Sequence, residues 1–125
     1  MPLARLAGRG AAGVDPDLFG TGPVRSAEIA LRRAGIEWGD LGPVELNEAF
    51  AAQSLACLAD WPELDPEIVN VDGDAIAIGH PLGASGGGIV TQPALEMRRG
   101  GSRWRLATLR IGVGQGIAVV LESAS

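Results

Sequence analysis

Cysteine and histidine are nearly absent from this sequence of 125 residues, which contains one of each, Cys57 and His80. A single cysteine excludes an internal disulfide framework. One histidine and one cysteine far apart in the sequence do not make the clustered donor set of a metal site, so no metal is expected. Cys57 lies among the apolar residues of an expected helix, which indicates a buried and inert thiol rather than a nucleophile.

Positive charge is also scarce. The 10 basic residues, all of them arginine, are outnumbered by 15 acidic residues, and the net charge is −5. This balance argues against nucleic-acid binding, which requires a basic face. No apolar run approaches the ~18 residues that a membrane-spanning helix needs, and the start of the chain does not resemble a signal peptide. We therefore expect a cytoplasmic protein with neither nucleic acid nor a membrane as its partner.

Apolar residues, in contrast, are abundant. Hydrophobic residues make up 46% of the chain and charged residues 20%. Such a composition is typical of a globular domain rather than of a disordered segment. The length suits one domain with one core over residues 1–125, and the sequence shows no internal repeat and no obvious boundary.

Hydrophobic spacing predicts alternating strands and helices. The clearest helix begins at Pro23, which suits a first helical turn, and ends at Gly35. In chain order, we expect a strand over 3–7, a loop over 8–22, a helix over 23–34, a strand over 43–46, a helix after Asn47, a connection over 60–66, a helix from about 83–85 to 100, and strands over 104–111 and 117–121. This order predicts an α/β fold, a three-layer sandwich with a mixed sheet and helices on both faces.

Three loops combine glycines with one polar group each. They are Asn47-Glu48-Ala49-Phe50, His80-Pro81-Leu82-Gly83-Ala84-Ser85-Gly86 and Gly112-Val113-Gly114-Gln115-Gly116. Small residues let a substrate approach the backbone, and amides at loop and helix starts can donate to a developing oxyanion. The pattern is typical of a site for carbonyl chemistry, although no plausible nucleophile lies in any of the three loops.

The glycine-rich stretches do not make a phosphate loop. The segment 83–88 lacks the Gly-Lys-Ser/Thr ending of a P-loop, and the segment 112–116 precedes a strand, whereas a dinucleotide fingerprint opens a helix. A tight turn with backbone donors is the better interpretation.

Two side chains in these loops are open to more than one interpretation. Asn47 is a preferred helix N-cap, in which case its side-chain oxygen is committed to the backbone. An asparagine that orients a water keeps its amide free, and spacing alone does not choose between the two. His80 stands at a loop tip before a helix, where an imidazole can donate a hydrogen bond or move a proton. We favour that interpretation over a surface histidine.

At these segments the chain resembles the C-terminal half of a thiolase, an acetyl-CoA acyltransferase. The resemblance covers nearly the whole chain, and its most specific parts are Asn-Glu-Ala-Phe at 47–50 and Gly-His-Pro-Leu-Gly-Ala-Ser-Gly at 79–86. Other similar segments are Ala12–Pro16, Gly20–Val24, Leu106–Leu109 and Gly114–Ala118. The resemblance implies one half of the family's α-β-α-β-α arrangement, with a mixed sheet of the five-stranded type. It identifies 1–125 as a thiolase C-terminal domain without the N-terminal half.

The resemblance also implies roles for four residues. Asn47 is similar to the asparagine that holds a water near the thioester oxygen. His80 is similar to the histidine that activates the nucleophilic cysteine and contributes to an oxyanion hole. Gly112 is similar to the glycine of the Cys-x-Gly loop, whose amide lines a second oxyanion hole. Arg110 occupies the position of that loop's cysteine, which moves the α-proton of the acyl group, and an arginine stays protonated and cannot act as this base.

The expected function follows from this resemblance. It implies a domain of a thiolase-type acyltransferase, for 3-oxoacyl-CoA thiolysis or acetyl-CoA condensation, with coenzyme A as substrate and no bound cofactor. The family's acyl-accepting cysteine belongs to the other half, so we expect a truncated or split gene product that is inactive alone. Its partners are then acyl-CoA or CoA when complemented, a thiolase N-terminal half, or a second copy of the chain. The alternative is a non-catalytic binding or assembly module that pairs with another thiolase-fold subunit.

Two structural expectations follow. A domain separated from its other half should expose an apolar surface. Arg110 shares a strand face with Leu106 and Thr108, so it should project into the site toward His80 and reach solvent or a carboxylate, because burying an unpaired charge is costly. Milder departures from the family pattern are Asp72 and Asp74 in place of Asn and Gly, Val113 in place of a glycine, and Pro93 inside a helix.

Overall fold

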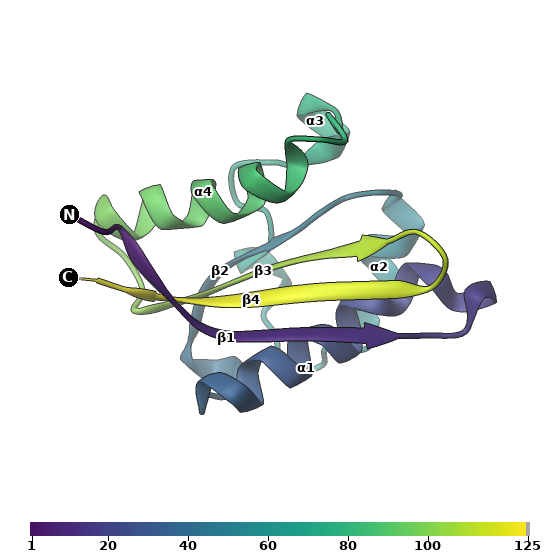
Figure 1. The fold of residues 1–125 in the computed structure, drawn as a ribbon, viewed down its shortest axis with the longest axis horizontal. Helices are drawn as coiled ribbons and strands as arrows, with labels where there is room; N and C mark the ends of the chain where they lie inside the picture. Colours follow the sequence, from purple (N-terminus) through teal and green to yellow (C-terminus); the bar gives the residue numbers. More distant parts are fainter. Residues whose placement is uncertain (125) are drawn as a thin grey trace.

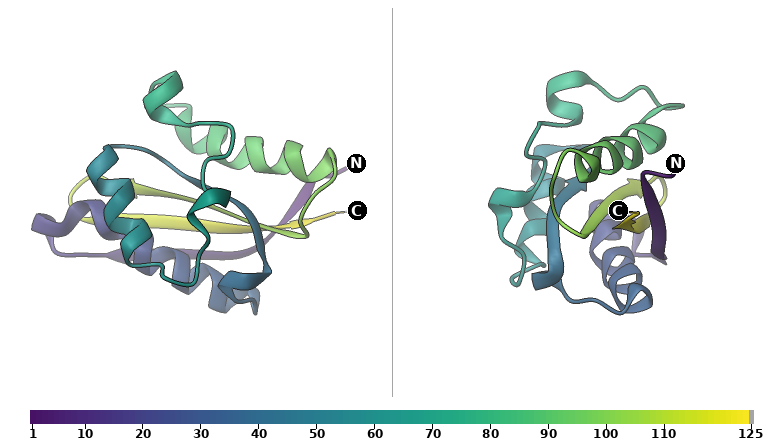
Figure 2. Two further views of the ribbon diagram at one scale, coloured as in Figure 1. Left: turned by 180° about the vertical axis from the view of Figure 1, so that it is seen from behind. Right: turned by 90° about the vertical axis from the view of Figure 1, so that its left-hand side faces the viewer.

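The computed structural model describes residues 1–124, which form three layers (Figure 1). In chain order the elements are β1 (Ala4–Gly13), the 3₁₀ helix η1 (Pro16–Thr21), α1 (Gly22–Ala34), η2 (Trp38–Asp40), β2 (Leu41–Leu46), α2 (Ala51–Ala59), η3 (Pro66–Ile68), α3 (Ala75–Ile78), α4 (Ser85–Arg98), β3 (Trp104–Ile111) and β4 (Gln115–Ser123). Helices α1 and α4 cover opposite faces of the sheet, as the two views of Figure 2 show. The predicted α/β class, with a mixed sheet between helical layers, is confirmed.

The sheet brings the ends of two strands to one edge. Its order is β1-β4-β3-β2, with β4 antiparallel to both neighbours and β2 parallel to β3. Parallel strands end at the same edge of a sheet, so the loops that begin at Asn47 and Gly112 are neighbours. This topology therefore puts the candidate functional residues of these loops at one edge of the sheet.

The sheet has four strands within residues 1–124, whereas the expectation was a sheet of the five-stranded type. Beyond β2, the described residues form one isolated parallel bridge, between Val44 and Val69. Val69 directly follows η3, and Asn70 has a positive φ of 51°, so the chain is extended for too short a stretch to pair further.

The first strand is longer than expected because its glycines serve packing rather than a loop. We expected a strand over 3–7 followed by a loop, but β1 continues to Gly13. A Cβ on Gly8 would lie 2.9 Å from the backbone nitrogen of Ala34, and one on Gly10 would lie 2.9 Å from that of Ala30. The glycines therefore let α1 lie directly on β1.

The core lies between the sheet and the layer of α1 and α2. Ala27 and Leu31 of α1 pack there, and Trp61 is 1% exposed, with its ring 5.3 Å from that of Trp38. On the opposite face, α4 buries Ile89 and Met97 against the sheet. No helix within residues 1–124 is long and apolar enough to cross a membrane.

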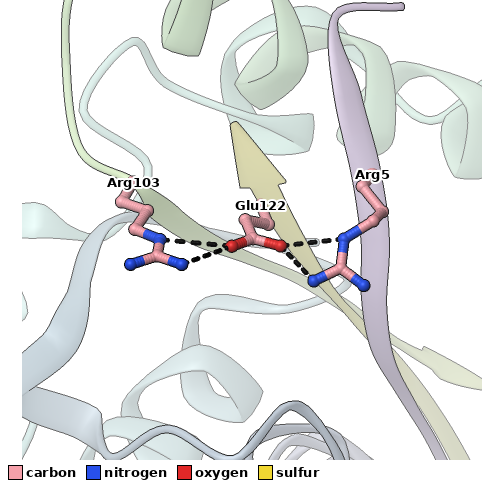
Figure 3. Close-up of polar contacts among 3 residues, drawn as sticks. All are labelled: Arg5, Arg103 and Glu122. Carbon is pink, nitrogen blue, oxygen red and sulfur yellow. Dashed lines mark hydrogen bonds and ion pairs between the residues drawn. The ribbon is translucent and has the colours of Figure 1, made fainter. Parts of the chain in front are cut away.

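A cluster of three charged side chains lies at the end of the sheet where both termini are found. Glu122 of β4 lies between Arg103 and Arg5, as Figure 3 shows. Arg103 donates from Nη2 at 2.8 Å and from Nε at 3.2 Å to one carboxylate oxygen, and Arg5 donates from Nε at 2.8 Å and from Nη2 to the other. Hydrogen bonds from Arg103 and then Arg5 hold the pKa of Glu122 below its usual value. The cluster therefore connects the start of β1 with the last part of β4 and with the residue that precedes β3.

Candidate active site

An open pocket of about 700 Å³ lies where β2 and β3 end. Its walls contain the four residues that the sequence singled out, Asn47, His80, Arg110 and Gly112, so the three loops converge as expected. The rest of the wall is mostly apolar and includes Ala49, Ile76, Leu82, Leu109 and Ile111. What the four residues do there stays a prediction, and the geometry of each limits its possible role.

Asn47 does not cap the following helix. Helix α2 begins at Ala51, with Phe50 at its N-cap and no capping side chain. Asn47 is 3% exposed, and its N–H donates to the carbonyl of Thr108 at 3.0 Å. Its Nδ2 donates to Oδ2 of Asp74 at 3.4 Å, while Oδ1 has no hydrogen bond within residues 1–124. Of the two interpretations, the cap is therefore wrong, and the side-chain oxygen is the atom left for a ligand or a water.

Glu48 belongs to a different helix from the one expected. A helix directly after Asn47 would have Glu48 in its first turn, but α2 begins only at Ala51, and the Glu48 carboxylate accepts from the N–H of Ile76 at 3.0 Å, in the first turn of α3. A carboxylate is favourable at that position because the first amides of a helix lack internal partners. The N–H of Glu48 donates to Oδ2 of Asp74 at 2.7 Å. Loop 47–50 is thus held by α3 and the residue before it.

Two residues that build the site were missed by the sequence analysis. One is Asp74, which holds both Asn47 and Glu48. The other is Asn70, whose Oδ1 accepts from the N–H of Leu46 at 2.8 Å and whose Nδ2 donates to the carbonyl of Leu46 at 2.8 Å. Asn70 therefore satisfies the last residue of β2, and asparagine tolerates its positive φ better than most residues. The Asn, Asp and Gly residues of 70–74 were the available signal, but Asp74 was noted only as a departure from the family pattern and Asn70 was given no role.

His80 is exposed and is oriented by Ser85, the first residue of α4. The Ser85 Oγ lies 2.7 Å from Nδ1 of His80 and 3.3 Å from the carbonyl of Pro81. When the hydroxyl donates to Nδ1, the ring proton is on Nε2. The imidazole then offers one N–H donor on the wall of the pocket, which is suited to binding a carbonyl oxygen.

Arg110 has aromatic neighbours where we expected solvent or a carboxylate. Its guanidinium carbon lies 5.0 Å from the ring centre of Phe19 and 5.4 Å from that of Phe50. The two rings meet edge to face with their centres 6.3 Å apart. Arg110 and His80 both line the pocket, as expected, but the Arg110 guanidinium contacts these two rings. Cation–π contacts of this kind stabilise a partly buried charge without an acid.

Gly112 is exposed at the start of a tight turn. Val113 and Gly114 follow with φ of 63° and 75°, and a Cβ on Gly114 would lie 2.5 Å from the carbonyl oxygen of Val14. At Gly112 an added Cβ would meet nothing within 4 Å. Packing therefore requires glycine at position 114 but leaves position 112 open, so the space beside the Gly112 backbone is available to a ligand.

Glu45 is a buried acid near the end of β2 that the sequence did not point to, and it lines a separate cavity with Asp72 and Asp74. It lies on β2, is 3% exposed, and its Oε1 has no hydrogen-bond partner within residues 1–124. Burial, followed by the negative charges of Asp74, Glu96 and Asp72, raises the pKa of Glu45 to about 7, against the opposing effect of Arg105. Among the described residues, no group of three acidic, His or Cys side chains is arranged to hold a metal ion.

Comparisons with known proteins agree on one family. A family model described as thiolase, C-terminal domain, matches residues 1–123. The acetyl-CoA acetyltransferase of Shinella zoogloeoides is 53% identical over 98% of this chain and 31% of its own length. The 3-ketoacyl-CoA thiolase of Photorhabdus laumondii is 50% identical over 97% of this chain and 32% of its own length.

Solved structures give the same result. Human mitochondrial 3-ketoacyl-CoA thiolase superposes with a TM-score of 0.95 at 45% identity, covering 100% of this chain and 32% of the human chain. A structure of that human enzyme in complex with CoA matches equally well. The chain therefore spans about a third of the length of the relatives it matches.

Proposed function

The chain belongs to the thiolase family, whose C-terminal domain it matches over residues 1–123, and from this premise we propose that it forms the oxyanion-binding side of a site for CoA-dependent acyl transfer. The reaction is thiolysis of a 3-oxoacyl-CoA or condensation of acetyl-CoA, with coenzyme A as a substrate. Relatives named acetyl-CoA acetyltransferase and 3-ketoacyl-CoA thiolase support this choice of chemistry.

The observation that carries the proposal is the meeting of Asn47, His80 and Gly112 on one pocket wall. In the proposed site, His80 donates from Nε2 to the thioester oxygen, and the free Oδ1 of Asn47 orients a water beside it. The exposed Gly112 backbone lines the place where a second oxyanion develops. Each such preorganised donor is worth roughly 10²–10³ in rate in comparable enzymes.

The site needs a nucleophile from outside the described chain. The only cysteine, Cys57, is buried in α2, and burial raises the pKa of its thiol to about 11. Such a thiol stays protonated near neutral pH and does not attack a thioester. We propose that the acyl-accepting cysteine is supplied by a segment equivalent to the part of the relatives that lies outside the match.

The rim of the pocket supports docking of such a segment. Leu82 on the pocket wall is 86% exposed, and two further apolar side chains are exposed close by in sequence, Ile78 at 82%, two residues before His80, and Val113 at 84%, directly after Gly112. Exposed apolar groups that gather around a site are typical of a surface that a partner covers. The second candidate, a non-catalytic module that docks on a thiolase-fold subunit, uses the same rim and is favoured by Arg110, because arginine cannot move the α-proton.

A reconstitution experiment tests the proposal. The purified chain is mixed with the N-terminal two-thirds of the Shinella zoogloeoides relative, and acyl transfer from acetoacetyl-CoA is followed by mass spectrometry and by loss of the substrate. We expect no thiolysis by the chain alone or by Arg110→Cys alone. With the added segment, we expect an acylated cysteine, and Arg110→Cys should raise turnover above that of the unchanged chain.

The control in this experiment is His80→Asn, which should dock but should not support acylation. A stable complex without acylation in any variant would favour the docking module. Turnover by the purified chain alone would overturn the proposal that its site is completed from outside.

A further inference from the structure

Arg110 is the cation on the pocket wall, and no acid within residues 1–124 pairs with it. The ion pairs within residues 1–124 use Arg5, Arg103 and Arg105, and none includes Arg110. The acid on the pocket wall, Glu48, is committed to the N–H of Ile76 and to Asn70. A positive charge is therefore available to a ligand in the pocket.

The two aromatic rings hold this cation without using its donors. Phe19 comes from η1 and Phe50 from the loop before α2, and both contact the guanidinium through ring faces. The Arg110 side chain makes no hydrogen bond to the described residues, so its N–H edges stay free. The guanidinium beside these two rings keeps its planar fork, which is the geometry that binds a carboxylate through two parallel hydrogen bonds.

The rest of the wall selects the remainder of the ligand. Ile76, Leu82, Leu109 and Ile111 give the pocket an aliphatic lining, and its volume of about 700 Å³ is that of a small-molecule site. A hydrocarbon chain suits this lining, whereas a sugar or a nucleotide base would leave polar groups unpaired against it.

We propose that the pocket binds a short acyl chain that carries a carboxylate, with the carboxylate on Arg110 and the chain against the aliphatic lining. This inference rests on the proposed function, because that function identifies the pocket as the place of the acyl group. It deepens the proposal by assigning the substrate class: an acidic acyl group rather than a neutral one.

A carboxylate fits better than a phosphate for two reasons. Phosphate sites gather several cations or a series of backbone amides around the ligand, whereas here one arginine stands in a chain with a net charge of −5. The glycine-rich turn after Arg110 leads into a strand rather than into a helix, so it lacks the helix N-terminus that phosphate loops use.

The test compares two ligands of nearly equal shape. Binding of butyrate and of its neutral analogue butyramide to the chain is measured by ligand-observed NMR at low and at moderate salt. We expect the chain to bind butyrate at least about tenfold more tightly than butyramide, with the preference falling as salt screens the charge. The variant Arg110→Gln should lose the preference.

The matched control is Arg25→Gln, which removes one positive charge from an exposed position on α1 and should keep the preference. Arg110→Lys, which keeps the charge but not the planar fork, should fall between the two. A circular dichroism melt verifies that each variant is folded. If Arg110→Gln does not fold, the butyrate and butyramide affinities of the unchanged chain and of Arg110→Lys decide.

Three results would overturn the inference: equal binding of the two ligands, an unchanged preference in Arg110→Gln, or tighter binding of inorganic phosphate than of butyrate at the Arg110 site. None of these measurements requires acyl transfer. Reconstituted acylation with no carboxylate preference would therefore reject the substrate class and leave the proposed function in place. A carboxylate preference without acylation in the reconstituted protein would reject the proposed function and leave carboxylate binding at Arg110 in place.

Discussion

The arginines at the two ends of the sheet have different side-chain partners. At the end with the termini, Arg5 and Arg103 share the carboxylate of Glu122 (Figure 3). At the end where β2 and β3 finish, Arg110 has no carboxylate partner among the described residues, and its guanidinium lies over two aromatic rings. A paired arginine holds strands together, whereas one held only by ring faces keeps its donors for a ligand. The comparison separates a structural end of the molecule, the terminal end, from a binding end, the pocket end.

The backbone differs between the two ends in the same direction. Within residues 1–124, the non-glycine residues with positive φ are Asn70 at 51° and Val113 at 63°. Both belong to the pocket end, one holding the last residue of β2 and the other following Gly112. A left-handed β-branched residue is strained, and such strain of roughly 1–3 kcal/mol is typical of functional sites. The backbone of the pocket end is therefore more strained than the backbone of the terminal end.

The largest effect on stability is expected from the buried acid of the pocket end. The pKa of Glu45 is raised from 4.5 to about 7 in the folded chain, chiefly by burial. The folded state therefore keeps this proton while the unfolded state loses it, so this group lowers stability as pH rises from about 4.5 to about 7. Glu45→Gln should raise the free energy of unfolding by up to about 3 kcal/mol near pH 8 and change it little near pH 4.

Urea unfolding over this pH range measures the effect, with Glu63→Gln as the control because Glu63 is exposed. If Glu45→Gln and Glu63→Gln have the same pH dependence, then Glu45 does not carry an unfavourable charge, and the pocket end is not the strained end.

A smaller loss is expected from Asp74, which organises the loop of Asn47. Asp74 is 7% exposed and accepts hydrogen bonds from the N–H of Glu48 and from Asn47. Asp74→Ala leaves a backbone donor unpaired and should cost about 1–3 kcal/mol. Asp74→Asn keeps an acceptor and should cost less. Both changes should lower the pKa of Glu45, because the charge of Asp74 helps to raise it.

Hydrogen exchange at the Glu48 amide reports this loop directly. We expect faster exchange in Asp74→Ala than in Asp74→Asn. Unchanged exchange in both variants would show that the loop is held by other contacts.

A smaller effect than that of Asp74 is expected at the terminal end. Hydrogen bonds from Arg103 and Arg5 lower the pKa of Glu122, so its contribution to stability is present above the ordinary pKa of 4.5 and is lost as pH falls through the lowered value. The two arginine side chains are 71% and 67% exposed, and solvent and salt weaken the cluster. Glu122→Gln should therefore lower the melting temperature slightly at neutral pH, and less at high salt.

The same melting experiment on Arg110→Gln sharpens the comparison. Removing an arginine that pairs with no acid should disturb the fold less than removing the shared carboxylate of the cluster. An equal or larger loss of melting temperature in Arg110→Gln would mean that this arginine is structural too, and the distinction between the ends would fail.

Local patterns predicted the elements well. Pro23 and Gly35 were expected to bound a helix, and α1 runs over Gly22–Ala34 with Gly35 in the left-handed conformation. Strand β3 was predicted at 104–111 and lies there. In these cases the signal is contained in consecutive residues, because helix ends and apolar runs depend on local geometry.

Contacts between distant segments were not predictable in this way. Gly8 and Gly10 suggested a loop, because the need for glycine arises only when α1 lies on the strand. Asn47 looked like a cap, because Asp74 comes from another part of the chain. Arg110 was expected to reach solvent or a carboxylate, since nothing in its own segment indicates contact with Phe19 or Phe50. The sequence thus indicated which loops form the site, but not the contacts that orient their side chains.

The central claim is that ligand contacts are confined to the end of the sheet where β2 and β3 finish. An amide chemical-shift map of the isotope-labelled chain during a butyrate titration tests it most directly. We predict shifts at Asn47, His80 and Gly112 and at the side-chain Nε of Arg110, with none at Arg5, Arg103 or Glu122. Shifts centred on the Glu122 cluster, or spread evenly over both ends, would contradict the account.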